Sequence, residues 1–298
     1  MRRQILTVAR HEWTDSVRSR RTLVVLVLYV AVSLAATAIF VTLLRSIERE
    51  FMRALGLKPA AGTGGVTVTV WQSDAFKRVV GDLVRDRDLA NALLGMPPLA
   101  LFFGWLSFTF GPLLVLLTAA GRIAEEVASG SARFVLFRCP RLAWTLGKFG
   151  GQALLILCGL VLSAATVTVF GWLRLESCDP AATVFAIFGL ALKVWVYCLP
   201  FLGLALGISQ VTRSPHLATA LSFLALMGLG IGGHVAEQNA AGGWARLWTL
   251  AAQLLPFSHQ PDLWRQDWAH VLPAAVVLMG LAGAYLLAGY ACLRRRDV

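Results

Sequence analysis

Residues 122–148 read RIAEEVASGSARFVLFRCPRLAWTLGK, and the fold of the whole chain can be worked out from this stretch. The stretch is charged and is interrupted by Gly130 and Pro140, yet it lies between two strongly apolar runs, 99–120 and 150–173. Each run is long enough to cross a hydrocarbon layer, which takes about 20 residues of helix. We therefore expect a structured polar loop between two membrane spans, placed to contact a soluble partner.

Composition indicates that most of the chain lies in a membrane. Charged residues make up 14% of the sequence, well below the roughly 25% of soluble domains, and the mean hydropathy is +0.69. Because backbone polar groups must be satisfied within lipid, each spanning segment should be a helix. We predict an all-α integral membrane protein with a single transmembrane domain over 1–298, its six spans lying at about 22–44, 99–121, 149–173, 183–208, 216–234 and 271–292.

The distribution of charge predicts the orientation. If the N-terminus is inside and six spans alternate, the inner segments carry 15 Lys and Arg against five Asp and Glu, whereas the outer segments carry 11 of each. This is the positive-inside pattern, so both termini and the 122–148 loop are expected in the cytoplasm. The net charge of +11 then reflects orientation and attraction to anionic lipid rather than binding of nucleic acid.

The N-terminal segment 4–21 is predicted to be an amphipathic interfacial helix, because apolar residues such as Ile5, Val8 and Val17 recur at helical spacing. It either anchors the chain in lipid and also touches a partner, or serves as an anchor alone. The first span is longer than the core of a usual signal peptide, which favours retention, although Ala36 and Ala38 form the small-residue pattern of a cleavage site.

The 122–148 loop contains a short helical signal. Ser131 is expected to cap a helix that runs through Arg138, and Pro140 ends it. Phe134 and Phe137 are three residues apart and therefore share one face. Exposed aromatic residues on a short helix fit a groove on a partner protein.

The alternative for the same loop is packing on the lipid surface. Glu125 and Glu126 would then lie poorly against anionic headgroups, which favours the contact with a partner.

Two segments are expected on the outer side. Residues 45–98 are predicted as a helix–strand–helix insertion with its strand near 66–70, serving either to select a substrate or to cover helix ends. Residues 236–270 are predicted as short amphipathic helices, with Trp244, Trp248, Trp264 and Trp268 at headgroup level. The histidines of this segment match no ligand spacing and the five cysteines are scattered, so no metal site or disulfide is predicted.

Within the spans, one charge and three glycine pairs stand out. Lys193 either contacts an anionic substrate in a central cavity or extends its amine to the outer interface. Close helix approach is predicted at three GxxxG pairs, Gly147/Gly151, Gly203/Gly207 and Gly228/Gly232.

Several chemistries are missing from the sequence. It contains no GxxxxGK[ST] motif to hold a nucleotide phosphate, and no carboxylate lies in a predicted span to carry coupled protons or sodium. No catalytic constellation can be assembled, so we expect neither an enzyme nor a cofactor in this chain.

The loop resembles the cytoplasmic signature of ABC type-2 exporter permeases, through Ile123-Ala124, Glu126, Gly130-Ser131, Arg133, Leu136, Pro140 and Gly147-Lys148. Residues 10–13 and 294–297 are similar to that family's termini, and the topology is similar to its six-span members, which include the permease of nitrous oxide reductase maturation. Two departures are visible: Ser131 stands where the family usually has Thr, and the spacing from Pro140 to Lys148 is about two residues shorter than expected.

The resemblance implies a bacterial inner (plasma) membrane permease, a dimer that binds two ABC ATPase subunits and leaves ATP and Mg²⁺ to them. The implied ATPase interface comprises Glu12, Glu125, Glu126, Gly130, Ser131, Arg133, Phe134, Phe137, Arg138 and Pro140. A membrane assembly or scaffold protein without transport activity is the alternative function.

Overall fold

The computed structural model describes residues 1–54, 87–174, 180–239 and 252–295. Within these ranges the regular structure is helical and contains no strand, which confirms the all-α prediction. The strand expected near 66–70, the helix expected after it, and the pair Trp244 and Trp248 lie outside the described residues.

Among the described residues, six helices are long and apolar enough to cross a membrane, as the sequence predicted. They are α2 (Arg20–Ala54), α6 (Pro98–Ala119), α9 (Arg141–Arg174), α10 (Pro180–Val211), α11 (Pro215–Asn239) and α14 (Trp268–Arg294). One clear difference from the prediction is at α9, which begins at Arg141 rather than near residue 149. Pro140 therefore lies directly before the long helix, and its carbonyl accepts a hydrogen bond from the Trp144 amide. Proline is tolerated at the start of a helix because the first amides have no partner within the helix.

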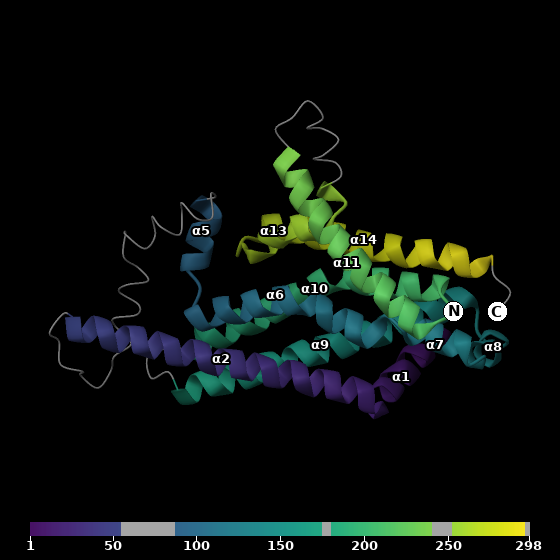
Figure 1. Cartoon of the computed structure of the whole chain (residues 1–298), viewed down its shortest axis with the longest axis horizontal. Coiled ribbons are helices and arrows are strands. Elements are labelled where there is room, and N and C mark those ends of the chain that lie inside the picture. Colours follow the sequence, from purple (N-terminus) through teal and green to yellow (C-terminus); the bar gives the residue numbers. More distant parts are fainter. Residues whose placement is uncertain (55–86, 175–179, 240–251, 296–298) are drawn as a thin grey trace.

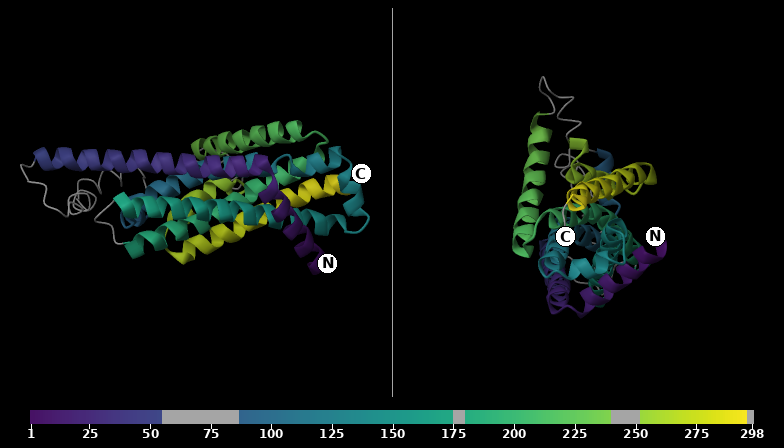
Figure 2. Two further views of the ribbon diagram at one scale, coloured as in Figure 1. Left: turned by 90° about the horizontal axis from the view of Figure 1, so that it is seen from below. Right: turned by 90° about the vertical axis from the view of Figure 1, so that its right-hand side faces the viewer.

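The short helices gather at the two ends of the bundle (Figure 1). One end carries α1 (Arg2–Arg18), α7 (Arg122–Ala128) and α8 (Ser131–Leu136), and we call it the α8 end. The other carries α5 (Arg87–Leu94), the 3₁₀ helix η1 (Pro256–His259) and α13 (Gln260–Trp264), and we call it the α13 end. Ser19, in an extended conformation, separates α1 from α2, so that α1 leaves the line of α2 at an angle (Figure 2).

Helix α10 lies at the centre and packs on α14, α6 and α9. Its contact with α14 is close because glycine replaces a side chain on both helices: a Cβ at Gly207 would lie 2.6 Å from the carbonyl oxygen of Tyr285, and Gly289 faces Gly207 directly. The Gly203/Gly207 prediction is thus confirmed. Among the described residues, nothing lies within 4 Å of a Cβ at Gly228, and the nearest atom to a Cβ at Gly232 is 4.0 Å away, so the close approach predicted for that pair is wrong within the described part of the chain.

The outer surface is apolar, as a membrane span requires. Helix α2 exposes Val24 and Val27 by 64% and 66%, and α11 exposes Leu224, Met227 and Ile231 by more than 60% each. Soluble monomers rarely expose apolar patches of this extent. In the end-on view α11 lies at the edge of the bundle (Figure 2), so that its outer face is available to lipid while its other face contacts α10, α6 and α7.

Candidate functional site

The turn between α7 and α8 depends on a single glycine. Gly130 has φ of 75°, in the left-handed region that glycine adopts without strain, and its carbonyl accepts the first hydrogen bond of α8 from the Arg133 amide at 3.2 Å. Gly130 is therefore the residue before the helix, and the expectation that Ser131 caps it is wrong. Ser131 is the first helical residue, and its hydroxyl instead contacts the Ser129 hydroxyl and the Glu126 carbonyl.

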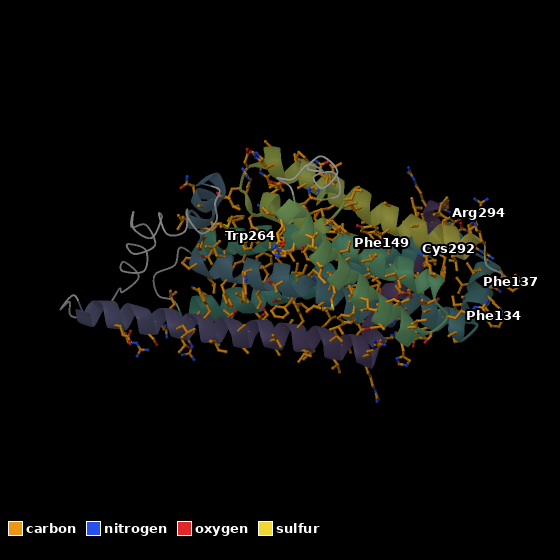
Figure 3. All side chains as sticks on the ribbon, turned by 45° about the horizontal axis from the view of Figure 1, so that its top comes forward. Phe134, Phe137, Phe149, Trp264, Cys292 and Arg294 are labelled. Carbon is orange, nitrogen blue, oxygen red and sulfur yellow. The ribbon has the colours of Figure 1, made fainter. Side chains whose placement is uncertain are left out.

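Helix α8 presents two phenylalanines to the outside. Phe134 is 78% exposed and Phe137 is 88% exposed, and both lie at the tip of the α8 end (Figure 3). The helix ends at Leu136, two residues before the predicted end, so Phe137 caps it rather than lying within it. Arg133 and Arg138 are exposed beside them. Exposed aromatic side chains with a basic rim are typical of a surface that binds a protein.

A groove of about 1150 Å³ opens next to these aromatic residues. One wall is α1 and the other is formed by α7, α8 and the first turn of α9; the lining residues include Arg3, Gln4, Thr7, His11, Asp15, Glu125, Ser129, Phe134, Phe137 and Arg138. The predicted interface residues Glu125, Glu126, Ser131 and Phe134 therefore line the same groove as the polar face of α1.

A buried ion cluster forms the floor of the groove. The Lys148 ammonium, whose side chain is 3% exposed, donates to Glu12 Oε2 at 2.6 Å and to Glu126 Oε1 at 2.5 Å. Glu12 comes from α1, Glu126 from α7 and Lys148 from α9, so one ammonium joins three helices. The Trp144 ring lies 5.6 Å from the same ammonium and covers one side of it.

Glu12 is held by a second set of contacts. Gln152 donates to Glu12 Oε1 at 2.7 Å and to the Ser16 hydroxyl at 3.0 Å. Burial would raise the pKa of Glu12, but the charge and hydrogen bond of Lys148, with the Gln152 amide, outweigh it and hold the pKa below its usual range. Glu12 is therefore an anion inside the chain, and only 4% of its surface is exposed.

Close backbone approach makes this cluster possible. A Cβ at Gly147 would lie 2.5 Å from Val8 Cβ, and one at Gly151 would lie 2.8 Å from Glu12 Cβ. The Gly147/Gly151 pair, which was predicted to mediate helix contact, thus packs against α1. The apolar face of α1 packs on α9 at this place, instead of serving only as a lipid anchor.

Further polar contacts fasten the neighbouring helices. Arg122 of α7 donates to the Thr22 hydroxyl of α2 and lies 3.5 Å from Asp15 of α1. The Ala124 amide donates to Ser209 of α10 at 2.9 Å. Arg141 donates to the carbonyls of Leu293 and Arg294 at the end of α14, at 3.0 and 3.1 Å.

The structure thus separates the predicted interface residues into two groups. Eight are exposed or lie on the turn: Glu125, Gly130, Ser131, Arg133, Phe134, Phe137, Arg138 and Pro140. Glu12 and, in part, Glu126 turn inward to Lys148.

Sequence reasoning missed the roles of Lys148 and Gln152. A signal existed, because Glu12 and Ser16 lie in phase with Ile5 and Val8 on α1, and a carboxylate on an apolar face requires a buried partner.

Lys193 lies elsewhere. Its ammonium donates at 2.7 Å to the carbonyl of Arg265, the residue that follows α13. The lysine therefore binds a helix end of its own chain at the α13 end, where Phe108, Tyr197, Phe201, Phe257 and Trp264 form an aromatic cluster.

Comparison with known proteins agrees with this architecture. A search of curated proteins found no match. The family model described as "ABC-2 family transporter protein" matches residues 6–297, from α1 to the end of α14. With nearly its whole length matched, the chain belongs to the ABC-2 family of transporter proteins.

Proposed function

We propose that this chain is the permease subunit of an ATP-driven ABC exporter and that the α8 end docks on a separate ATPase subunit. Membrane proteins of the ABC-2 family are transport components that generally pair with an ABC ATPase. The observation that carries the docking site is the exposure of Phe134 and Phe137 beside the groove of the α8 end. Two copies of the chain would form the pathway and two ATPase subunits would bind below them, with the α8 end in the cytoplasm.

The positive charge of the α8 end supports this orientation. Exposed arginines of α1, α8 and the end of α14 lie there, which is the excess of positive charge expected on a cytoplasmic face. The ATPase would supply nucleotide binding, and this chain would supply the surface that moves when the ATPase closes. A displacement of α8 would be transmitted to the membrane spans through short connections, because α7 follows α6 after two residues and α9 follows α8 after four.

The test is a double substitution, Phe134→Ala with Phe137→Ala. A well-buried aromatic anchor contributes about 2 kcal/mol or more to an interface, so we expect the double variant to bind the ATPase at least about 100-fold more weakly. Co-purification with the ATPase, and its affinity in detergent, measure this directly. Insertion should be unchanged because both side chains point away from the bundle (Figure 3).

The matched control is Phe185→Ala with Phe188→Ala. These two phenylalanines are also three residues apart and are 80% and 36% exposed, but they lie near the start of α10, at the opposite end of the bundle. The control should retain the ATPase. The docking assignment would be contradicted if the Phe134/Phe137 variant still bound the ATPase, or if the control lost ATPase binding to the same extent.

A further inference from the structure

The ion cluster of Lys148 lies between the proposed docking helix and the membrane spans. Its ammonium belongs to α9, and its two carboxylates come from α1 and from α7, which leads into α8 through Ser129 and Gly130. We propose that Lys148 is a positioning residue that holds α1, α7 and the first turns of α9 together as one rigid unit, here named the α1–α7–α9 block. This inference rests on the proposed function, since the block would carry α8 and so transmit its displacement.

Burial of the charges makes the contact all-or-none. The Lys148 side chain is 3% exposed and that of Glu12 is 5% exposed, so separating them would leave a charge in apolar surroundings. A partial slide of α1 along α9 would break the bonds of Gln152 to Glu12 and Ser16 at the same time. The block therefore has no gradual way to deform at this place.

The shapes of the two helices fix the same register. Gly147 and Gly151 leave space for Val8 and Glu12 of α1, and a Cβ at either glycine would collide with them. A shift of α1 by one turn would place other side chains over these glycines. The ionic and the steric fit thus select a single arrangement.

A second ion pair offers an internal comparison. Arg122 also links α7 to α1, through Asp15 at 3.5 Å, but the Asp15 side chain is 63% exposed. Exposed pairs contribute little because water screens them. If Lys148 is the positioning residue, loss of Asp15 should have little effect on the block, and Asp15→Asn is therefore the matched control for Lys148→Met.

Hydrogen exchange of the full chain in detergent tests the holding role without any partner. In Lys148→Met, backbone amides of α1 and α7 should exchange at least about 10-fold faster, and the increase at α10 and α14 should be much smaller. Asp15→Asn should resemble the wild type. Equal protection of α1 in Lys148→Met and wild type would overturn the proposal, as would a uniform loss of protection throughout the chain.

A disulfide tests the rigid-body claim even if Lys148→Met does not fold. A Cβ at Gly150 would lie 3.9 Å from Ala9 Cβ, close to the separation of about 3.8 Å in disulfides. Ala9→Cys with Gly150→Cys should therefore form a bond that fixes α1 to α9. We expect the oxidised protein to bind the ATPase that co-purifies with the wild type. It should stimulate MgATP hydrolysis by that ATPase as much as the wild-type chain does.

In Lys148→Met, loosening of the block should remove the stimulation of MgATP hydrolysis. The same disulfide should restore that stimulation to Lys148→Met, whereas the single-cysteine variants under the same oxidant should not. Loss of stimulation in the oxidised double-cysteine protein, reversed by dithiothreitol, would show that α1 moves on α9 and would overturn the proposal. These outcomes are separable from the proposed function. If the wild type binds no ATPase, the docking assignment fails, while the exchange experiment still tests Lys148.

Discussion

The two ends of the bundle each contain a lysine in an apolar setting, but the two ammonium groups bind different kinds of partner. At the α8 end, Lys148 is buried between two carboxylates, and the aromatic residues Phe134 and Phe137 are exposed. At the α13 end, the aromatic residues are packed together and the half-buried Lys193 binds a backbone carbonyl. A pair of fixed carboxylates specifies which helices meet, whereas a carbonyl at a helix end accepts any nearby donor. The α8 end is therefore built to position a surface, and the α13 end to fill the space between helices.

The largest effect expected from breaking this contrast is at Lys148. In Lys148→Met, the buried Glu12 loses its counter-ion, and Glu126, whose side chain is 32% exposed, loses its partner. Removal of one member of a buried ion pair typically costs about 3–5 kcal/mol of the free energy of unfolding. Thermal unfolding in detergent measures the loss. The triple variant Glu12→Gln, Glu126→Gln and Lys148→Met removes all three charges and should recover most of the stability. If Lys148→Met were as stable as the triple variant, the two carboxylates would not need Lys148 as their counter-ion.

A smaller effect is expected at Lys193. In Lys193→Met the chain loses one charged hydrogen bond to the Arg265 carbonyl, and such bonds contribute about 1.5–3 kcal/mol. No carboxylate partner of Lys193 is seen among the described residues, so no buried anion is left behind. Hydrogen exchange should rise at α13 and remain unchanged at α1. A loss of stability equal to that of Lys148→Met would remove the distinction between the two ends.

The sequence predicted the architecture well because membrane spans depend on local composition. Their six positions follow from apolar length alone, and the exposed pair Phe134 and Phe137 follows from helical spacing. The partner of a buried charge does not follow in this way. Glu12 and Lys148 are 136 residues apart, and their meeting depends on how α1 folds back on α9 after Ser19.

Glycine illustrates the same limit on a smaller scale. The GxxxG spacing is identical at Gly147/Gly151, Gly203/Gly207 and Gly228/Gly232, yet among the described residues only the first two pairs face another helix closely. Whether a groove on one helix is filled depends on the tertiary arrangement, and α11 lies at the edge of the bundle (Figure 2), where only one of its faces meets other helices. The cap of α8 likewise depends on the left-handed backbone of Gly130, which took the place predicted for Ser131.

The central claim, that the α8 end docks on an ATPase, is tested most directly by photo-crosslinking in native membranes. A photoreactive amino acid in place of Phe137 should capture a protein that mass spectrometry identifies as an ABC ATPase, because the Phe137 side chain is 88% exposed at the α8 end of the bundle. The same probe in place of Phe185, 80% exposed near the start of α10, should not. Capture of the ATPase at Phe185 but not at Phe137 would contradict the account.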